Sequence, residues 1–351
     1  MKPTTTAITI AGLCIGLTTL ASPALAVNPD KDSKATNKAE QDKPKLEDFV
    51  DVKLPELFIG SKAPKLQIDK FVKGESVQDF EEGKVYVVEF WATWCGPCIA
   101  AFPHLSDLQE QYEGDARFLG INIWEGVEDQ AERIEKIENF VEDQGERMGY
   151  TVAVESGSAM ADTWMRPAGQ NGIPAAFIVD GTGHIAWIGH PMGMDETLEQ
   201  VVSGDYDREA AVKQYKKDNI VMAAANKFAE NIQAGQNIDE ATTIANILID
   251  DYIHDNPQML NAIAWMMLNA EAEGIGEKQY KTAHRAASVA AEKTQWKDWS
   301  ILDTYAMAAF KTGSTQEAIK WQKKAIELTP SDNAEAKAEL EKRLEQYQSQ
   351  G

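Results

Sequence analysis

Two cysteines, Cys95 and Cys98, stand three positions apart in the run Trp-Cys-Gly-Pro-Cys. A short apolar run of β-forming residues, 85–90, comes just before them, and a segment of helical spacing follows, so Cys95 is expected at the amino terminus of a helix. Unpaired backbone N–H groups and the helix dipole stabilise a thiolate there and lower the pKa of a cysteine from about 8.5 towards 7. We therefore predict that Cys95 is the attacking nucleophile and that Cys98 resolves the mixed disulfide.

The number and spacing of the cysteines favour a redox role over a structural one. The sequence holds 3 cysteines, and the third, Cys14, lies in an amino-terminal segment that we expect to be removed. A disulfide between Cys95 and Cys98 closes a very short loop, where a cross-link contributes little to stability. The alternative is half of a structural zinc site, which needs two further Cys or His ligands. Because the histidines are scattered along the chain, no metal site is predicted.

A second metal alternative concerns His190, Met192 and Met194, which alternate after a predicted hairpin. Imidazole and thioether groups could hold copper in an exported protein. Methionines in such a place more often form an adaptable apolar rim or simply pack, so this alternative stays open but is not the prediction.

The elements that must position the cysteine pair alternate between strand and helix from residue 54 to residue 205. Residues 85–90 and 117–124 are predicted strands, and the segment between them has apolar residues at helical spacing. An amphipathic helix is predicted around residues 134–141, and an antiparallel hairpin over residues 175–188 with Gly181-Thr182-Gly183 at its turn. This order of elements predicts an α/β sandwich around a central sheet.

The cysteine motif, directly after a strand that ends in Phe-Trp-Ala and with Pro103 five residues beyond Cys98, resembles thioredoxin. The opening at residues 59–64 and the insert from Glu125 to about Gln170 are similar to the exported TlpA-like disulfide reductases of the redoxin family. The resemblance covers about residues 54–204 and implies a thioredoxin-like sandwich, in which Trp94 covers the nucleophile.

Two further site residues follow from this resemblance. Ile173-Pro174 matches the family's cis-proline loop, which packs against the disulfide and pairs with a bound peptide, although Pro174 alone could equally be an ordinary proline that leads a strand. Glu89 matches the buried carboxylate of thioredoxin, which could take the proton from Cys98 if burial raises its pKa. The family often has Asp or Asn there, and a surface-facing Glu89 is the alternative.

Beyond about residue 206 the strand signals stop, and segments of helical period continue to residue 351. Ala283, Ala286 and Ala290 are echoed 35 positions later within residues 318–325, a period typical of stacked helix pairs. The segment 311–330 resembles a tetratricopeptide repeat. We predict that residues 206–351 form an all-α, tetratricopeptide-like domain that binds a peptide or protein.

The amino-terminal residues predict the compartment. Lys2 is followed by an uncharged stretch that ends in Ala24-Leu25-Ala26, which predicts a secretory signal over residues 1–26, cleaved after Ala26, and a periplasmic or extracellular location. An uncleaved anchor is the alternative. Residues 27–53 are rich in charged residues and are predicted to be a flexible linker. The net charge of −22 argues against nucleic acid as a partner.

Together these features predict an extracytoplasmic thiol-disulfide oxidoreductase with no cofactor beyond its own Cys95–Cys98 disulfide. Gly96 and Pro97 are the two residues that thioredoxin has between its cysteines, and the thioredoxin potential of about −270 mV is strongly reducing. The predicted activity is therefore reduction of disulfides in protein substrates. Because the compartment is oxidising, the TlpA-like resemblance implies a membrane thiol reductase as electron donor.

Parts of the sequence also fit two other functions, a binding module and a peroxidase. The tetratricopeptide-like region could be the working part, with a thioredoxin-like domain that only binds, although an intact cysteine pair argues against a redox-silent domain. A peroxidase would share the fold, but peroxiredoxins have Thr or Ser three residues before the reactive cysteine, where this chain has Ala92.

Overall fold

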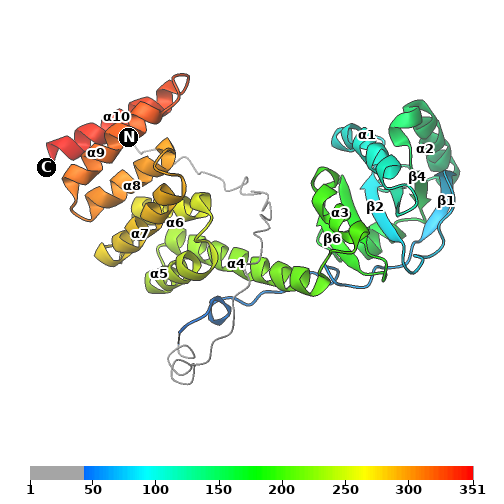
Figure 1. Ribbon diagram of the computed structural model, residues 1–351, viewed down its shortest axis with the longest axis horizontal. Coiled ribbons are helices and arrows are strands. Elements are labelled where there is room, and N and C mark those ends of the chain that lie inside the picture. Colours follow the sequence, from blue (N-terminus) through cyan, green and yellow to red (C-terminus); the bar gives the residue numbers. More distant parts are fainter. Residues whose placement is uncertain (1–42, 351) are drawn as a thin grey trace. The chain divides into compact units, whose positions relative to one another are not determined.

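The computed structural model describes residues 43–350 of the chain. The predicted signal peptide, Cys14 and most of the predicted linker lie outside the described residues. The remainder is drawn in Figure 1 as a sheet with its helices, followed by a series of helices. We call residues 54–205 the sheet domain and residues 206–350 the helical domain. None of the helices in the described part combines the length and the apolar character that a membrane-crossing segment needs.

The sheet domain contains one mixed sheet of six strands, in the order β1-β4-β3-β2-β5-β6. Its central strand, β2, runs parallel to β3 and antiparallel to β5. Every residue of β2 is buried, as expected for a run of β-forming residues that is covered on both faces. The strands are β1 (Ile68–Lys73), β2 (Val85–Trp91), β3 (Ala116–Asn122), β4 (Thr151–Glu155), β5 (Ala175–Val179) and β6 (Ile185–Gly189).

Strands β1 and β4 were not predicted from the sequence. Strand β4 is only 5 residues long and wholly buried, so it carries no alternation that would reveal it. It lies inside the segment 125–170 and pairs with both β3 and β1. Strand β1 is a partly exposed edge strand with charged residues, a common way to protect an edge. The insert therefore extends the sheet.

Helices cover both faces of the sheet. Figure 1 shows α1 (Gly96–Gln111) and α3 (Asp195–Ser203) over one face, and α2 (Gln130–Gln144) contributes buried residues to the same core. The single π-helical turn η3 (Ala161–Met165) packs Trp164 into the core on the opposite face. Two short 3-10 turns, η2 (Gly145–Met148) and η4 (Pro191–Gly193), complete the sheet domain. Pro103 lies inside α1.

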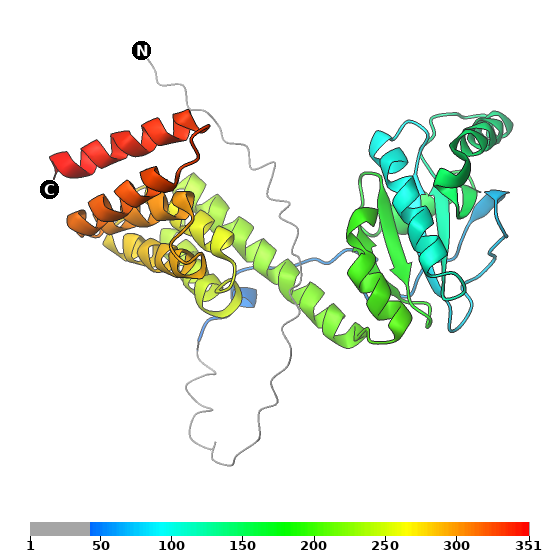
Figure 2. The same cartoon turned by 45° about the horizontal axis from the view of Figure 1, so that its top comes forward.

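The helical domain contains only helices, and consecutive helices pack against one another, α6 with α7, α8 with α9 and α9 with α10 (Figure 2). Gly or Pro stands at most of the connections, at Gly235, Pro257, Gly276, Gly313 and Pro330, whereas residues 294–298 between α7 and α8 contain neither. The helices are α4 (Arg208–Ala234), α5 (Ile238–Ile247), the π-helical turn η5 (Leu248–Tyr252), α6 (Pro257–Asn269), α7 (Glu277–Lys293), α8 (Trp299–Lys311), α9 (Thr315–Leu328) and α10 (Ala334–Ser349).

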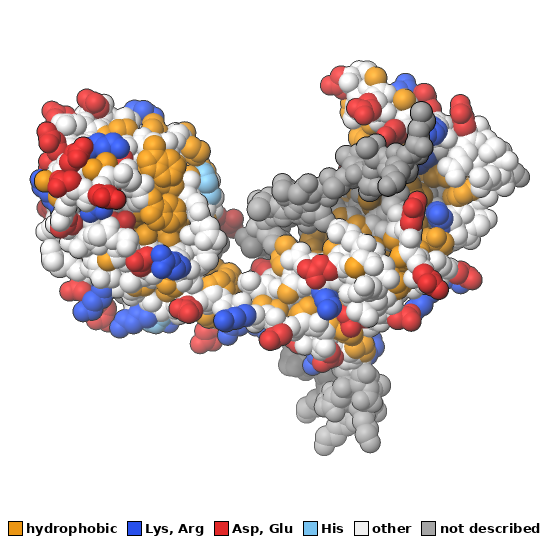
Figure 3. Space-filling model, turned by 180° about the vertical axis from the view of Figure 1, so that it is seen from behind, with side chains coloured by type: hydrophobic (Ala, Val, Ile, Leu, Met, Phe, Trp, Pro, Cys, Tyr) orange, Lys and Arg blue, Asp and Glu red, His pale blue; other side chains and the backbone are white. Residues whose placement is uncertain are grey.

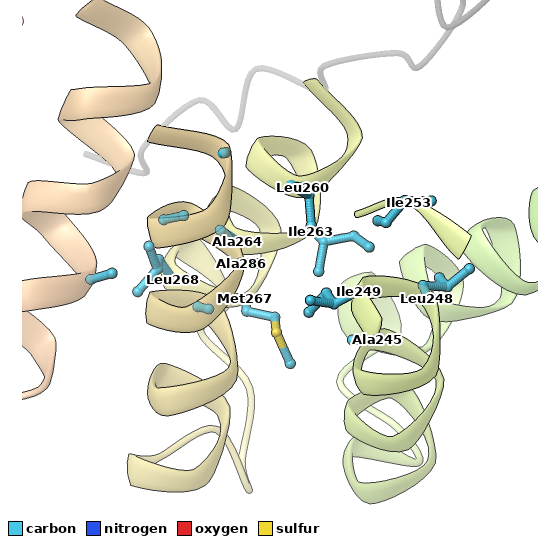
Figure 4. Packing of buried hydrophobic residues seen from close by; sticks show 14 of the residues in the cluster. Ala245, Leu248, Ile249, Ile253, Leu260, Ile263, Ala264, Met267, Leu268 and Ala286 are labelled. Carbon is cyan, nitrogen blue, oxygen red and sulfur yellow. The ribbon is translucent and has the colours of Figure 1, made fainter. Parts of the chain in front are cut away.

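The alanines of the 35-residue echo lie in the core of the helical domain. Ala283, Ala286 and Ala290 of α7 are fully buried, as are Ala318 and Ala325 of α9. Small side chains at these positions let neighbouring helices approach closely. Figure 4 shows the centre of the largest cluster, where apolar side chains of α6 meet those of α5 and η5. The arrangement is a series of packed helices, and the assignment to the tetratricopeptide family stays a prediction.

Part of the predicted linker has local structure. Residues Leu46–Asp48 form a 3-10 turn, η1, that packs against α4. Leu46 is fully buried in the core of the helical domain, and Phe49 and Val50 pack against that core. The many charged residues of this segment predict a linker. They do not reveal that Leu46 packs into the core of the helical domain.

Candidate redox site around Cys95 and Cys98

Cys95 and Cys98 form a disulfide at the amino terminus of α1. Cys95 is the N-cap residue of the helix, and its Sγ accepts a hydrogen bond from the backbone N–H of Cys98 at 3.2 Å. Free N–H groups and the helix dipole at this position favour negative charge on that sulfur. Cys98 has no exposed surface, whereas Cys95 keeps 3%. An incoming sulfur therefore meets Cys95 first.

Ile173 and Pro174 lie beside the disulfide. The Ile173–Pro174 peptide bond is cis, and the carbonyl oxygen of Ile173 lies 3.7 Å from the Sγ of Cys95. Pro174 directly precedes β5, which is also where an ordinary strand-leading proline would stand. Pro174 therefore leads strand β5 and also forms the cis peptide bond that lies beside the disulfide.

An apolar rim is open to solvent near the cysteines. Trp94, Trp124 and Met192 are 60%, 38% and 54% exposed, and Figure 3 shows hydrophobic side chains gathered on the surface of this domain. The indole N–H of Trp94 donates to the carbonyl oxygen of Trp124 at 3.0 Å, which ties the residue before Cys95 to the loop after β3. Trp94 and Trp124 therefore present aromatic surface to solvent directly beside Cys95.

The copper alternative does not fit the structure. Met194 is fully buried in the core, while Met192 is 54% exposed, so the two thioethers lie in different environments. The Nδ1 atom of His190 instead accepts the backbone N–H of Met192 at 3.3 Å. Within residues 43–350, no three side chains of the His, Cys, Asp or Glu types gather in a way that would hold a metal ion.

Glu89 is buried beneath the site, and the surface-facing alternative is wrong. Its side chain is 1% exposed, and neither carboxylate oxygen has a hydrogen-bond partner in the protein. Its neighbours at alternate positions of β2, Val87 and Trp91, belong to the core that also contains Cys98. Burial raises the pKa of Glu89 well above its usual value of 4.5. A raised pKa makes the carboxylate form of Glu89 a better proton acceptor than an ordinary glutamate.

Three polar groups meet around Gly120, which stands opposite Glu89 in the β2–β3 pair. A side chain on Gly120 would lie 2.8 Å from the ring of Tyr150, 3.3 Å from the indole nitrogen of Trp91 and 3.5 Å from a carboxylate oxygen of Glu89. The hydroxyl of Tyr150 and the Trp91 indole N–H are buried without protein partners. Tyr150 was not identified from the sequence, because its position beside Glu89 depends on strand pairing.

Glu125 is a second buried carboxylate that the sequence did not reveal. Its side chain has no exposed surface and pairs with Lys136 of α2 at 2.6 Å. It also accepts the backbone N–H of Thr93 at 3.1 Å and the side-chain amide of Asn122 at 2.9 Å, and the Thr93 hydroxyl donates to it. Burial would raise its pKa, but these hydrogen bonds outweigh burial and hold the pKa below the usual value. Glu125 is therefore ionised.

Comparison with known proteins shows the family. A sequence model of the AhpC/TSA family matches residues 59–188. The thiol:disulfide interchange protein HelX of Rhodobacter capsulatus is 30% identical over 135 residues, which cover 38% of this chain and 68% of HelX. The chain belongs to the AhpC/TSA family. Protein FixW of Rhizobium leguminosarum is 29% identical over 175 residues, covering 48% of this chain and 76% of FixW.

Solved structures that are similar to part of this chain include a putative thiol:disulfide interchange protein DsbE from Chlorobium tepidum. It is 21% identical, covers 42% of this chain and 97% of its own, and superposes with a TM-score of 0.33. The residues matched by the AhpC/TSA family contain both cysteines and the cis-proline, and they end before the helical domain begins.

Proposed function

We propose that this AhpC/TSA-family protein is a thiol-disulfide oxidoreductase that reduces disulfides in protein substrates outside the cytoplasm. The observation that carries the proposal is the Cys95–Cys98 disulfide at the helix amino terminus. The apolar rim that contains Trp94 offers a surface for an unfolded or flexible substrate segment, and the thiol:disulfide interchange activity named for HelX supports the same reaction. Ile173 and Pro174 would hold that segment by backbone pairing.

The reaction proceeds in two exchanges. In the reduced protein, the Cys95 thiolate attacks one sulfur of the substrate disulfide, the substrate S–S bond breaks, and a mixed disulfide forms. Cys98 then transfers its proton to the ionised carboxylate of Glu89, and its thiolate attacks the Sγ of Cys95. The bond between Cys95 and the substrate sulfur breaks, and that sulfur leaves as a thiolate and takes up a proton. The substrate leaves with both sulfurs reduced, and the Cys95–Cys98 disulfide forms. Two electrons pass from the cysteine pair to the substrate. The proposed reaction uses no redox cofactor other than the Cys95–Cys98 pair itself.

The direction of electron flow is part of the proposal. Gly96 and Pro97 separate the cysteines as in thioredoxin, which supports a reducing potential. A reductant in an oxidising compartment must be reduced again, so a membrane thiol reductase is proposed as the electron donor. The amino-terminal residues 1–26 support export, and the helical domain is proposed to select partners by binding a peptide or a protein surface.

Trapping of mixed disulfides tests this function. The full chain with Cys98→Ser cannot resolve the mixed disulfide, so it should accumulate covalent complexes that disappear on addition of dithiothreitol. The matched control is the full chain with Cys95→Ser, which keeps Cys98 but lacks the nucleophile and should trap nothing. If the Cys98→Ser chain captures no partner, the proposed reaction is contradicted.

The direction is tested separately by equilibrating the wild-type pair with glutathione. A potential near that of thioredoxin, about −270 mV, supports the reductase proposal, whereas a value near about −120 mV, as in DsbA, would make the protein an oxidant.

A further inference from the structure

Glu125 connects the loop before the nucleophile to the end of β3. The backbone pairing of β2 and β3 continues as far as the hydrogen bond from the Ile123 N–H to the Trp91 carbonyl oxygen, at 2.9 Å. Beyond it, the Glu125 carboxylate receives the N–H and the hydroxyl of Thr93, two residues before Cys95. In a continued parallel ladder the Thr93 N–H would bond the carbonyl oxygen of Ile123, and the Glu125 carboxylate takes the place of that partner.

Trp124, the residue before Glu125, has a backbone conformation that is unfavourable for a large side chain. Trp124 has a φ of +53°, a left-handed conformation that is uncommon for a residue with a large side chain. That conformation presents the Trp124 carbonyl oxygen to the indole N–H of Trp94. Trp94 and Thr93 are thus both held by consecutive residues of one loop, immediately before Cys95.

The charge of Glu125 is enclosed while that of its partner is not. The Glu125 side chain has no exposed surface, whereas the Lys136 side chain is 44% exposed. Water and salt screen an exposed charge much more than a buried one. The Lys136 ammonium therefore offsets only part of the field of the buried carboxylate at the cysteine pair.

We propose that Glu125 is a positioning residue that orients Trp94 and Cys95 through Thr93 and, by its negative charge, makes the Cys95–Cys98 pair more reducing. This inference rests on the proposed function, because it concerns the redox poise of the same cysteines. A buried negative charge disfavours the Cys95 thiolate and thereby raises the pKa of that thiol. A thiolate that is less stabilised gives a less stable reduced form, and the pair then donates electrons more readily.

The test uses two substitutions in the full chain that have opposite electrostatic effects. Glu125→Gln removes the negative charge and keeps the shape of the side chain, so the Cys95 pKa should fall and the pair should become more oxidising. Lys136→Gln leaves the buried carboxylate without its partner, so the pair should become more reducing. Each change should alter the equilibrium constant with glutathione by roughly threefold to tenfold, and tenfold corresponds to about 30 mV for two electrons.

The matched control is Glu135→Gln, which removes the same charge from an exposed side chain of α2. It should leave the potential and the Cys95 pKa unchanged. A purely structural role for Glu125 predicts that both test variants lose stability and that neither shifts the potential, and that result overturns the proposal. If Glu125→Gln does not fold, Lys136→Gln decides the question alone, because an unchanged or more oxidising potential contradicts the proposal.

The two proposals can fail separately. If Cys98→Ser traps no partner while the two variants still shift the Cys95 pKa in opposite directions, the proposed function fails and the role of Glu125 stands. If trapping succeeds and the variants leave the Cys95 pKa and the potential unchanged, the function stands and the role of Glu125 is wrong.

Discussion

At the scale of single residues, ionisation of Glu89, below the cysteine pair, makes the free energy of unfolding depend on pH. Its carboxyl group is buried without a hydrogen-bond partner, and burial raises its pKa well above 4.5. The folded protein therefore binds this proton more tightly than the unfolded chain does. Stability contributed by the protonated form is complete below the unfolded pKa and is lost as the pH rises from there through the folded pKa.

The substitution Glu89→Gln should remove this pH dependence. Glutamine cannot ionise, so the variant should keep its free energy of unfolding over the pH range in which the wild-type protein loses stability. Urea unfolding of the oxidised full chain at a series of pH values measures the difference. Glu82→Gln, at an exposed position, is the control and should follow the wild-type curve. Parallel curves for wild type and Glu89→Gln would show that Glu89 ionises without cost.

Residue by residue, the sequence revealed the groups whose chemistry is local. Cys95 and Cys98 are recognisable because a strand and a motif mark them in the sequence, whereas the role of Ile173-Pro174, 78 positions from Cys95, came only from the family resemblance. The burial of Glu89 was left open, since a strand that is covered on both faces shows no alternation. Glu125 was missed because its partner Thr93 is separated from it by 32 positions. Only the pairing of β2 with β3 brings the two together.

At the scale of elements, the pairing of β2 with β3 creates a space that only glycine fits. Gly120 stands opposite Glu89, and a Cβ atom there would lie 2.8 Å from the ring of Tyr150. The ring is buried, so it cannot swing away into solvent. Overpacking of a core costs about 1–3 kcal/mol.

We therefore expect Gly120→Ala to lower the free energy of unfolding by about 1–3 kcal/mol. Gly172→Ala is the matched control, since an added Cβ there meets no atom within 4 Å, and its stability should equal that of the wild-type protein. Urea denaturation of both variants measures the two costs. Equal midpoints for Gly120→Ala and wild type would mean that Tyr150 moves without penalty.

The elements themselves were predicted unevenly, for physical reasons. The helices of the helical domain have enough turns to show a period, and Gly or Pro marks most of their ends. Strand β4 has only 5 residues and all of them are buried, so it shows no alternation of apolar and polar residues. Strand β1 does not alternate regularly between buried and exposed residues. The π-helical turns η3 and η5 depend on one extra residue within a helical segment, which leaves the hydrophobic pattern almost unchanged.

At the scale of the whole molecule, the chain enters the helical core before it enters the sheet. Leu46 is buried among helical-domain residues, whereas Leu57 is buried in the core of the sheet domain. The chain returns to the helices through α4, which begins at Arg208, and Arg208 pairs with Asp180 of the sheet domain at 3.0 Å. The core of the helical domain therefore also contains a side chain from before the sheet domain, Leu46.

This arrangement predicts that Leu46→Ala destabilises the helical domain, although Leu46 lies far from its helices in the sequence. Truncation of a fully buried leucine costs about 2–5 kcal/mol. Hydrogen exchange of the full chain, read by mass spectrometry, should show faster exchange in peptides from α4 to α6, which supply core residues of the same cluster. Peptides from β2 and β3 should keep their wild-type protection, because the sheet has its own core.

The neighbouring substitution Glu47→Ala is the control, since Glu47 is exposed in the same turn. It should leave exchange in α4 to α6 unchanged. The comparison then shows whether the effect of Leu46→Ala comes from the lost buried side chain or from a change in the charge or flexibility of residues 45–50. If Leu46→Ala also leaves these helices fully protected, the buried leucine contributes nothing to them. Residues 45–50 would then contact the helical domain without adding to its free energy of unfolding.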